Sequence, residues 1–337
     1  MNILLTGGAG YIGSHTAVVL ANAGHHVVLL DNLCNSQPEV AERVADIVGQ
    51  SLILEVADVR DTQNTQQLLR AHNIQAVVHL AGLKAVDGSV QQPLAYFDVN
   101  VGGAISLLKA MKAEGVRQLV FSSSATVYGQ PKYLPLDEGH PTRGTNPYGQ
   151  TKLHIEQMLR HLADSDPTWR IVILRYFNPV GAHASGLIGE DPSGMPNNLM
   201  PYMARVAKGQ LPHLNVWGSD YSTVDGTGVR DYLHVMDLAE GHLAALLYLA
   251  GHSAEAYDVF NLGTGLGTSV LQMVQAFEEA CGSSVPLQMA PRRPGDVAEC
   301  WANPAKAQEI LQWRASRSLE EMCASAWKFC TIFQSSA

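Results

Sequence analysis

Residues 2–13 read NILLTGGAGYIG, and this stretch decides the fold. A short apolar run is followed by glycines at positions 7, 10 and 13 and then by an apolar-periodic helix that continues to Leu20. Glycine permits a tight turn, lets the backbone approach a pyrophosphate and lets the helix pack on the strand. The amino terminus of that helix offers free N–H groups to phosphates. The strand–turn–helix context therefore predicts a dinucleotide site lined by Gly7, Gly10 and Gly13.

Alternating apolar runs continue through the first half of the chain. Strands are expected at residues 26–30, 52–56, 76–80 and 119–121, and a long helix is expected over 93–114. The alternation lasts to Leu174 and predicts a parallel sheet with right-handed crossovers. The expected fold class is α/β, a doubly wound parallel (Rossmann) sheet.

The pattern changes after Pro179. Residues 181–195 are rich in Gly and Pro, which indicates a loop into a smaller mixed α/β lobe. Residues 1–177 are expected to bind the dinucleotide, together with a returning strand near 257–262. Residues 178–337 are expected to form mainly the substrate lobe, interleaved with the first domain.

Composition excludes several classes of function. The 337 residues carry a net charge of −9 without long like-charge runs, which argues against nucleic acid as a partner. The amino terminus does not read as a signal peptide, and the apolar stretch 243–250 is too short to span a membrane. The 13 scattered histidines show no metal-ligand spacing. Five cysteines without a Cys-x-x-Cys pair suggest reduced thiols in a cytoplasmic protein.

Polar residues at the ends of the predicted strands identify the cofactor. Asp31 follows the second strand, where a carboxylate binds a ribose hydroxyl of NAD and repels the extra phosphate of NADP. Asp58 and Val59 follow the third strand and are placed to meet the adenine. Lys84 could reach phosphate or ribose, or be a solvated loop lysine. Asn100 is unfavourable inside a helix, so it has either a polar role or a place on the surface.

The stretch PYGQTK at residues 147–152 carries the candidate chemistry. Tyr148 and Lys152 lie one helical turn apart on the same face. A free tyrosine has a pKa of about 10, and a nearby ammonium and a cationic nicotinamide would lower it. The pair is therefore predicted to be a general base for a sugar or alcohol hydroxyl. The alternative is an amphipathic helix with an exposed lysine and a half-buried tyrosine.

The serines at 122–124 follow the fifth strand, at the edge where ligands bind in open α/β sheets. Together with the glycines, Asp31 and the Tyr148–Lys152 pair, they resemble the extended short-chain dehydrogenase/reductase superfamily. Within it, the chain is similar to the UDP-glucose 4-epimerase family over nearly its whole length. The stretches that carry this similarity are DNLCNS (31–36), AGLKA (81–85), RYFNPVGA (175–182), PNNLMP (196–201) and GVRDY (228–232).

The resemblance implies a reaction and a quaternary structure. The reaction is NAD-dependent interconversion of UDP-glucose and UDP-galactose through a transient 4-keto sugar. The family is usually a homodimer, joined by a helical bundle that would include residues 93–114 and 148–162. No partner other than the UDP-hexose and a second copy is implied.

The resemblance also implies roles for individual residues. Tyr148 is the base, Lys152 its electrostatic partner and ribose anchor, and Ser124 a proton shuttle to the sugar 4-hydroxyl. The residues implied to bind NAD are Gly7, Gly10, Tyr11, Ile12, Gly13, Asp31, Asn32, Asn35, Ser36, Asp58, Val59, Leu80, Ala81, Gly82, Lys84, Asn100, Ser122, Tyr148, Lys152 and Tyr176. The residues implied to bind the UDP-sugar are Ser124, Tyr148, Asn178, Asn198, Leu199, Asn215, Val216, Arg230, Tyr232, Arg293, Asp296 and Cys300. One position departs from the family's sequence pattern: the family often has Asn-Asn where this chain has Val99-Asn100.

Three residues of the second half, Arg230, Arg293 and Cys300, have a physical argument or an alternative beside the resemblance. Arg230 and Arg293 are expected on the pyrophosphate, because guanidinium groups bind phosphate oxygens bidentately; the alternative is surface salt bridges. Asp296 is implied to bind the uridine ribose. Cys300 is implied to border the sugar 2-substituent, where a tyrosine would block N-acetylhexosamines. Cysteine there predicts, as a hypothesis, turnover of UDP-GlcNAc and UDP-GalNAc; the alternative is a small buried thiol.

Three other functions compete with epimerisation. A nucleotide-sugar 4,6-dehydratase also oxidises carbon 4, but that family places Asp-Glu where this chain has Ala125-Thr126, which argues against it. A NAD-dependent nucleotide-sugar dehydrogenase is not excluded by motif, and release of free NADH would favour it. A non-catalytic NAD-sensing protein would be indicated by loss of Tyr148 or Lys152, and both are present.

Overall fold

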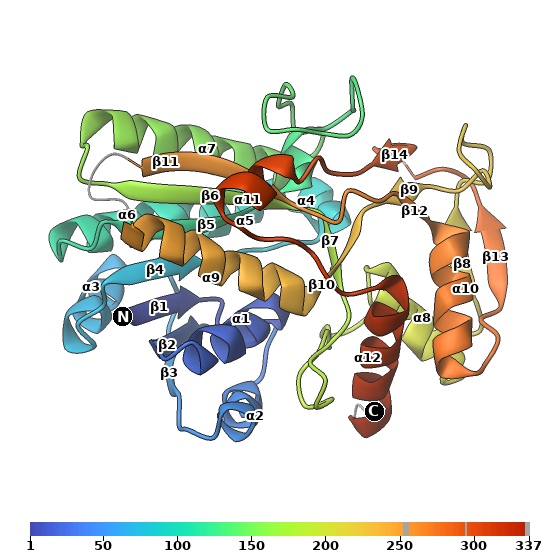
Figure 1. The fold of residues 1–337 in the computed structure, drawn as a ribbon, viewed down its shortest axis with the longest axis horizontal. Helices are drawn as coiled ribbons and strands as arrows, with labels where there is room; N and C mark the ends of the chain where they lie inside the picture. Colours follow the sequence, from blue (N-terminus) through green and yellow to red (C-terminus); the bar gives the residue numbers. More distant parts are fainter. Residues whose placement is uncertain (252–255, 294, 334–337) are drawn as a thin grey trace.

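A computed structural model describes residues 1–251, 256–293 and 295–333 of the chain. Its centre is a seven-stranded parallel sheet in the order β11-β6-β5-β4-β1-β2-β3 (Figure 1). The strands are β1 (Asn2–Thr6), β2 (His26–Asp31), β3 (Ile53–Val56), β4 (Ala76–His79), β5 (Gln118–Ser124), β6 (Arg170–Tyr176) and β11 (Ala256–Leu262). The order 3-2-1-4-5-6 is that of a doubly wound Rossmann sheet, so the predicted fold class is confirmed.

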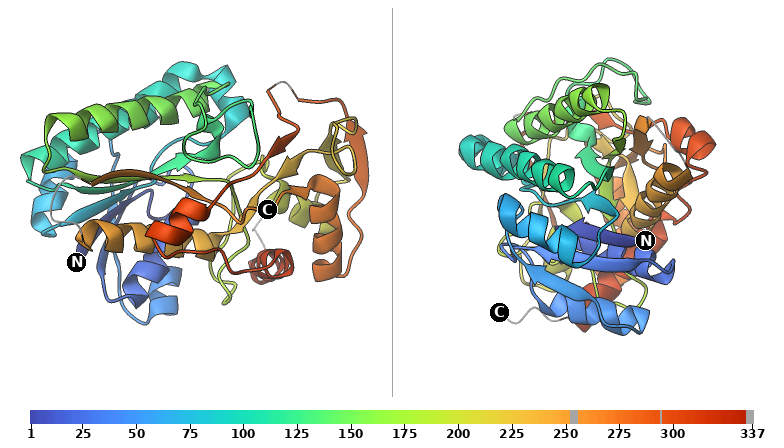
Figure 2. Two further views of the ribbon diagram at one scale, coloured as in Figure 1. Left: turned by 45° about the horizontal axis from the view of Figure 1, so that its top comes forward. Right: turned by 90° about the vertical axis from the view of Figure 1, so that its left-hand side faces the viewer.

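Helices cover both faces of this sheet, as the end-on view in Figure 2 shows. One buried core lies between the sheet and the helices α1 (Tyr11–Asn22), α2 (Glu39–Val48) and α9 (Val235–Gly251). The other lies between the sheet and α3 (Thr62–Ala71), α6 (Gly103–Ala113) and α7 (Pro147–Ser165). Alternate strand residues face opposite cores: Ile3 and Leu5 join the first, and Leu4 joins the second. Continuous apolar runs form these strands because both faces are buried.

The long helix expected over residues 93–114 is interrupted. After α4 (Val86–Gln91), the chain forms α5 (Pro93–Tyr96), a π-helical turn η1 (Phe97–Gly102) and then α6. Asn100 lies in the π turn and is buried, with its side chain bonded to a neighbouring loop. π turns are frequent at functional sites, and this one turns a polar side chain inward.

In the part of the chain that the structure describes, the second lobe combines three small sheets and three helices. Strand β7 (Asn178–Val180) pairs with β10 (Tyr232–His234), and β8 (Leu214–Trp217) pairs with β13 (Leu287–Ala290). The third sheet has the order β12 (Thr268–Ser269), β9 (Val229–Arg230) and β14 (Glu299–Cys300). A third core gathers around α8 (Leu199–Ala207), α10 (Val270–Cys281) and α12 (Leu319–Ile332). The remaining short helices are η2 (Ala125–Val127) and α11 (Ala305–Ile310).

The chain crosses between the sheet and this lobe more than once. Helix α9 and strand β11 follow β10 in sequence, yet they belong to the central sheet and its cover. The division at residue 177 stays a prediction, and residues 334–337 of its second unit lie outside the described part. Among residues 1–251, 256–293 and 295–333, no helix is both long and apolar enough to cross a membrane.

Candidate active site

The glycine loop between β1 and α1 forms a cradle that side chains would fill. Gly7 has φ +69°, and a Cβ there would lie 2.9 Å from the backbone nitrogen of Ala81. A Cβ on Gly13 would lie 2.1 Å from the backbone oxygen of Gly7. The N-cap of α1, Gly10, has no capping side chain, which leaves the helix amino terminus open to an anion. The cradle therefore fits the pyrophosphate of a dinucleotide.

Residues at the tips of β2 and β3 lie beside this cradle. The Asp31 carboxylate accepts hydrogen bonds from the Ala9 backbone N–H at 3.1 Å and from the Ser36 hydroxyl at 2.9 Å. Asn32 donates to the Asp58 carboxylate at 3.1 Å, and hydrogen bonds from Arg60 hold the pKa of Asp58 below its ordinary value. The Asp31 side chain therefore lies at the strand tip beside the glycine turn, and its contact with the ribose of NAD stays a prediction.

The other residues predicted at the cofactor come from the same edge of the sheet or the adjoining loops, because the strands are parallel. Asn35 is exposed in the loop after β2, and Val59 is buried in the core below β3. The rest lie in α1, in the loop after β4 and at the end of β6: Tyr11, Ile12, Leu80, Ala81, Gly82 and Tyr176.

Helix α7 presents the candidate acid–base pair. It begins at Pro147, and the side chain of its N-cap Asn146 accepts a hydrogen bond from the Gly149 backbone at 2.9 Å. Tyr148 and Lys152 are both buried. The Lys152 ammonium donates to the backbone oxygen of Ser122 at 2.7 Å, which fixes it against the end of β5. Burial lowers the pKa of Lys152 to about 8.

Ser124 is the last residue of β5 and lies next to this helix. Its Oγ accepts hydrogen bonds from the Thr126 backbone N–H at 3.2 Å and from the Thr126 hydroxyl at 3.0 Å. Both lone pairs of the serine oxygen are then used, so its own proton is free to be donated. Ser124 is also hydrogen-bonded to the Tyr148 phenol, and this bond lowers the pKa of that phenol. The arrangement can pass a proton between Tyr148 and a hydroxyl at Ser124.

The expectation that Lys152 and a cationic nicotinamide together make this phenol acidic stays a prediction. Burial raises the pKa of Tyr148 to about 12 and outweighs the hydrogen bond from Ser124. The ammonium of Lys152 is directed to the Ser122 carbonyl and is itself desolvated. A base at neutral pH therefore requires a further positive charge near the phenol, which an oxidised nicotinamide would supply.

Ser122 is held by a histidine that the sequence did not indicate. Its hydroxyl lies 2.7 Å from Nε2 of the buried His242, whose Nδ1 lies 2.9 Å from the Leu238 backbone oxygen. Only a protonated Nδ1 can donate to that oxygen, so Nε2 is the acceptor and Ser122 donates. Burial lowers the pKa of His242 to about 4, which keeps the ring neutral. His242 thus anchors the strand end whose carbonyl binds Lys152.

Asn100 has the polar role that was one of its two predicted readings. Its Oδ1 accepts from the Leu83 backbone N–H at 2.8 Å, and its Nδ2 donates to the Leu83 oxygen at 3.1 Å and to the Thr151 hydroxyl at 3.0 Å. It therefore fastens the loop that follows β4 to helix α7. A direct contact with the cofactor stays a prediction.

Lys84 is not a free loop lysine. Its ammonium pairs with the Glu190 carboxylate at 2.9 Å, although the lysine side chain is about half exposed (49%). Asn198, immediately before α8, donates to the same carboxylate oxygen at 2.5 Å. No sequence pattern predicted a role for Glu190, since an acidic residue in a Gly- and Pro-rich segment is ordinarily solvated.

The remaining substrate candidates line the second lobe. Arg230 on β9 and Cys300 on β14 are direct partners in the register of the small sheet, and burial raises the pKa of the thiol to about 11. Arg230 donates to the Val229 backbone oxygen at 2.9 Å, whereas Arg293 pairs with Asp296 at 2.9 Å. The others lie at the start of β7, at the start of α8, on β8 and on β10: Asn178, Leu199, Asn215, Val216 and Tyr232. In the described part of the chain, no group of three or more His, Cys, Asp or Glu side chains could hold a metal ion.

Comparison with known proteins gives the family. The sequence model of the family described as GDP-mannose 4,6 dehydratase matches residues 4–326. A Homo sapiens protein named UDP-glucose 4-epimerase is 56% identical over 334 residues, covering 97% of this chain and 95% of that protein. One of the same name from Bacillus subtilis (strain 168) is 55% identical over 329 residues, covering 98% and 96%.

Solved structures agree with these relatives. A UDP-glucose 4-epimerase from Stenotrophomonas maltophila with bound NAD and formylated UDP-arabinopyranose has a TM-score of 0.96 and 50% identity, with 98% of each chain covered. One from Bifidobacterium longum in complex with NAD+ and UDP has a TM-score of 0.95 and 50% identity at the same coverage. Identity of half or more over almost the full length, on one shared fold, means that this chain belongs to the UDP-glucose 4-epimerase family.

Proposed function

We propose that the chain is a NAD-dependent enzyme that inverts carbon 4 of UDP-hexoses and interconverts UDP-glucose and UDP-galactose. One observation carries this proposal: Tyr148, Lys152 and Ser124 converge at the carboxyl edge of the sheet. The solved epimerases that contain NAD and UDP ligands support it. In this proposal residues 1–177 and β11 bind NAD, and residues 178–337 mainly hold the UDP-sugar.

The proposed chemistry divides between cofactor and chain. Oxidised nicotinamide, when bound, accepts hydride from carbon 4 and returns it to the opposite face of the sugar. Tyr148 takes the 4-hydroxyl proton through Ser124 and later returns it, while Lys152 anchors the ribose. Arg230 and Arg293 hold the pyrophosphate, so the 4-keto sugar can rotate without leaving.

The nearest competing reaction is removal of water from the sugar. The matching family model carries the name of a 4,6-dehydratase, but water elimination needs an acid and a base at carbons 5 and 6. Ala125 and Thr126 stand where dehydratases place that Asp-Glu pair, and Thr126 is engaged with Ser124. These residues favour epimerisation.

The direct test is incubation of the purified protein with UDP-galactose and no added NAD. We expect UDP-glucose to form without release of free NADH, because the cofactor returns to its starting state. Tyr148→Phe should lower kcat by about 10²–10⁴-fold, whereas Tyr133→Phe, at an exposed tyrosine, should not. Release of NADH in proportion to substrate consumed would indicate a dehydrogenase instead.

We also propose that N-acetylated UDP-hexoses are substrates. Support comes from the small side chain of Cys300, on the strand beside Arg230. The expected result is conversion of UDP-GalNAc by the parent, with Cys300→Tyr losing that activity and retaining conversion of UDP-galactose. A parent that leaves UDP-GalNAc unchanged at high enzyme concentration contradicts this proposal.

The proposed assembly is a homodimer in the cytoplasm. Val90 on α4 and Leu94 on α5 are 63% and 84% exposed, close to α7, which supports a helical bundle as the interface. The free thiol state of all five cysteines supports a reducing compartment. Light scattering should give twice the chain mass, and Leu94→Glu should reduce it to one chain. The exposed Leu247 on α9 supplies the control, since Leu247→Glu should leave the dimer intact.

A further inference from the structure

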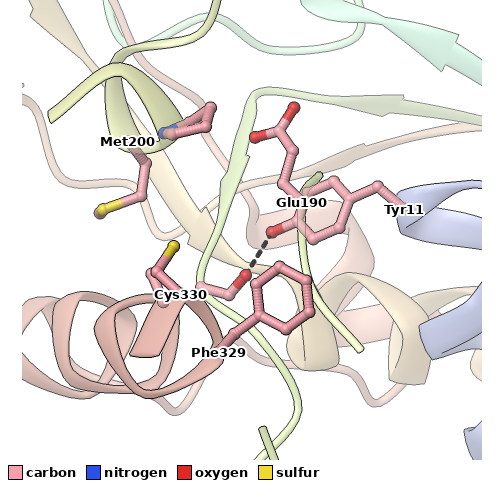
Figure 3. Close-up of a pocket in the computed structure, with 8 residues that line it drawn as sticks. Tyr11, Glu190, Met200, Phe329 and Cys330 are labelled. Carbon is pink, nitrogen blue, oxygen red and sulfur yellow. Dashed lines mark hydrogen bonds between the residues drawn. The ribbon is translucent and has the colours of Figure 1, made fainter. Parts of the chain in front are cut away.

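Segments from distant parts of the chain meet at buried polar groups, and the hydrogen bond from Tyr11 to Gly181 is one such contact (Figure 3). Another is the carboxylate of Asp231, which lies in the second lobe between strands β9 and β10 (Figure 1). Asp231 is fully buried, with 0% of its surface exposed. Among the described residues, its side chain accepts hydrogen bonds from four neutral donors. A buried carboxylate with this many partners fixes the chain around it.

Each oxygen of this carboxylate accepts two hydrogen bonds. Oδ1 accepts from the backbone N–H and the hydroxyl of Thr264 at 2.8 and 2.6 Å. Oδ2 accepts from the backbone N–H groups of Gly265 and Ala302 at 3.0 and 3.1 Å. Thr264 and Gly265 follow β11, whereas Ala302 follows β14. The carboxylate therefore fastens two segments that are far apart in sequence.

The four donors favour the ionised form of Asp231. A carboxylate has about four lone-pair sites, so a proton on either oxygen would have to displace one of the donors. Burial raises the pKa of Asp231, and the bonds from Thr264, Ala302 and Gly265 act in the opposite direction. The side chain is therefore a buried negative charge that neutral groups satisfy.

The backbone of Asp231 is bonded to residues of the predicted UDP-sugar set. Its N–H donates to the Cys300 oxygen at 3.1 Å, and its carbonyl oxygen accepts from the Asn178 N–H at 3.0 Å. Arg230 precedes it directly in the chain and is the register partner of Cys300. A displacement of Asp231 would therefore move three residues of that set.

The charge of Asp231 by itself opposes binding of the proposed ligand. UDP carries a negatively charged pyrophosphate, and a carboxylate next to the arginine that is proposed to hold it repels that group. A favourable effect of Asp231 on binding must therefore come from the positions that it fixes. Charge and position predict opposite effects of a neutral side chain, so an experiment can separate them.

We infer that Asp231 is a positioning residue for the UDP-sugar, an inference that rests on the proposed function. Its carboxylate holds the segments after β11 and β14, and its backbone holds Asn178 and Cys300 beside Arg230. These residues are then ordered before the substrate arrives, so binding costs less conformational freedom. In the described part of the chain, none of its hydrogen bonds reaches the predicted acid–base residues on α7 and β5, so it acts on binding and not on proton transfer.

Steady-state kinetics of the holoenzyme with UDP-galactose test the inference. Asp231→Asn keeps the shape but has one acceptor oxygen in place of two, so two of the four donors lose their acceptor. KM should rise about tenfold, which is the scale of one hydrogen bond to a charged group. The rate constant kcat should stay within about twofold of the parent, because the acid–base residues are unchanged. The inhibition constant of UDP should rise together with KM.

Thr264→Val is a milder second variant, which keeps the test open if Asp231→Asn does not fold. It removes one of the four donors to Asp231 and leaves the charge and the backbone bond of residue 264 in place. KM should rise about threefold, as for loss of one ordinary hydrogen bond, and kcat should stay at the parent value.

Asp237 on α9 supplies matched controls. It is also fully buried, and its carboxylate accepts from the Ser316 N–H at 3.3 Å, the Ser316 hydroxyl at 3.1 Å and the Arg317 backbone N–H at 3.1 Å. None of these three residues belongs to the predicted sites. Asp237→Asn and Ser316→Ala should lower Tm and keep the KM of the parent. Thermal unfolding of all variants separates a change in binding from a loss of fold.

The sign of the change in KM decides the inference. A lower KM in Asp231→Asn would mean that its charge, and not its placement of neighbouring residues, governs binding. An unchanged KM in both variants, or a rise that Asp237→Asn shares, would limit Asp231 to a structural role. A fall in kcat at constant KM would contradict an effect on binding.

The inference and the proposed function fail in different ways. A parent that binds UDP but converts no UDP-galactose overturns the proposed function, and the Kd of UDP, measured by calorimetry, then tests Asp231 in place of KM. A parent that binds no UDP overturns both.

Discussion

At the residue scale, Thr126 decides where the proton of Ser124 points. Its backbone N–H and hydroxyl both donate to the serine oxygen. Thr126→Val keeps the shape and removes the hydroxyl donor, so Ser124 can turn away from Tyr148. We expect kcat to fall about threefold to tenfold with KM nearly unchanged, since one neutral hydrogen bond is lost. Steady-state kinetics with UDP-galactose test this, and Thr126→Ser should recover the parent rate; equal losses in both variants would exclude the hydroxyl as the cause.

Lys152 gives a prediction about stability and pH. Its pKa falls from 10.5 to about 8 on folding, so between these values the unfolded chain binds more protons than the folded chain. Stability contributed at this position therefore rises with pH over that range, and the cost of the buried charge is greatest below about pH 8. At low pH the free energy of unfolding of Lys152→Met should exceed that of the parent by up to about 1–3 kcal/mol. The loss of the bond to Ser122 reduces this difference by the same amount at every pH.

Urea unfolding of parent and variant at about pH 7 and pH 9.5 measures this difference. The free energy of unfolding of Lys152→Met, relative to the parent, should be lower at the higher pH than at the lower one. A relative stability that stays constant would mean that the ammonium is not desolvated in the folded chain.

At the element scale, helix α7 is fixed to the sheet one turn beyond Lys152. The Glu156 carboxylate accepts from Arg175 of β6 at 2.6 Å and from the Ser123 hydroxyl of β5 at 2.5 Å, and all three side chains are buried. The ion pair fastens the helix that carries Tyr148 to β6, and the bond from Ser123 aligns it with the strand that carries Ser124. The ion pair joins residues of two different elements. Patterns within one element do not predict such a contact, so the sequence did not indicate it.

Removing the charge of Glu156 alone should lower the free energy of unfolding strongly. Glu156→Gln leaves the Arg175 guanidinium buried without its counter-charge, so we expect a loss of about 3–5 kcal/mol in the free energy of unfolding. Denaturant unfolding followed by circular dichroism measures it. The pair between Arg70 and Glu114 is the control, and Glu114→Gln should lower the free energy of unfolding much less. If both variants lose a comparable free energy of unfolding, burial does not strengthen the contribution of the pair between Glu156 and Arg175.

At the scale of the whole molecule, the sheet domain and the second lobe are joined by contacts between distant segments. Tyr11 donates to Gly181, Lys84 pairs with Glu190, and the Arg43 guanidinium of α2 lies 4.0 Å from the ring centroid of Phe333 beyond α12. Each link runs from the amino-terminal half to the carboxyl-terminal half. Together they keep the two proposed binding surfaces in one orientation.

Tyr11→Phe tests the first of these links. It leaves the buried Gly181 oxygen without its donor, which should cost about 1–3 kcal/mol and lower Tm by about 2–4 °C per kcal/mol. Differential scanning calorimetry gives both values. Tyr133→Phe, whose hydroxyl bonds to Asp137 at the surface, should leave Tm unchanged. An unchanged Tm in Tyr11→Phe would mean that water replaces the phenol at no cost.

Much of the fold followed from local patterns. Strand β2 covers His26–Asp31, where the apolar run over 26–30 predicts a strand, and the glycines at 7, 10 and 13 form the expected turn after β1. Such features depend on residues within a few positions of each other. The π turn at Asn100 was not predicted, and the Asn100 side chain bonds there to Leu83, in a segment that local sequence patterns do not connect to it.

The sequence by itself determined the sheet, the glycine cradle and the identity of the candidate base, since strand period, turn chemistry and helix spacing are all short-range. Only the tertiary structure decided the ionisation of Tyr148, the register of Cys300 beside Arg230 and the shared partners of Glu190. Burial and long-range pairing set these properties, and both exist only once distant segments have packed together.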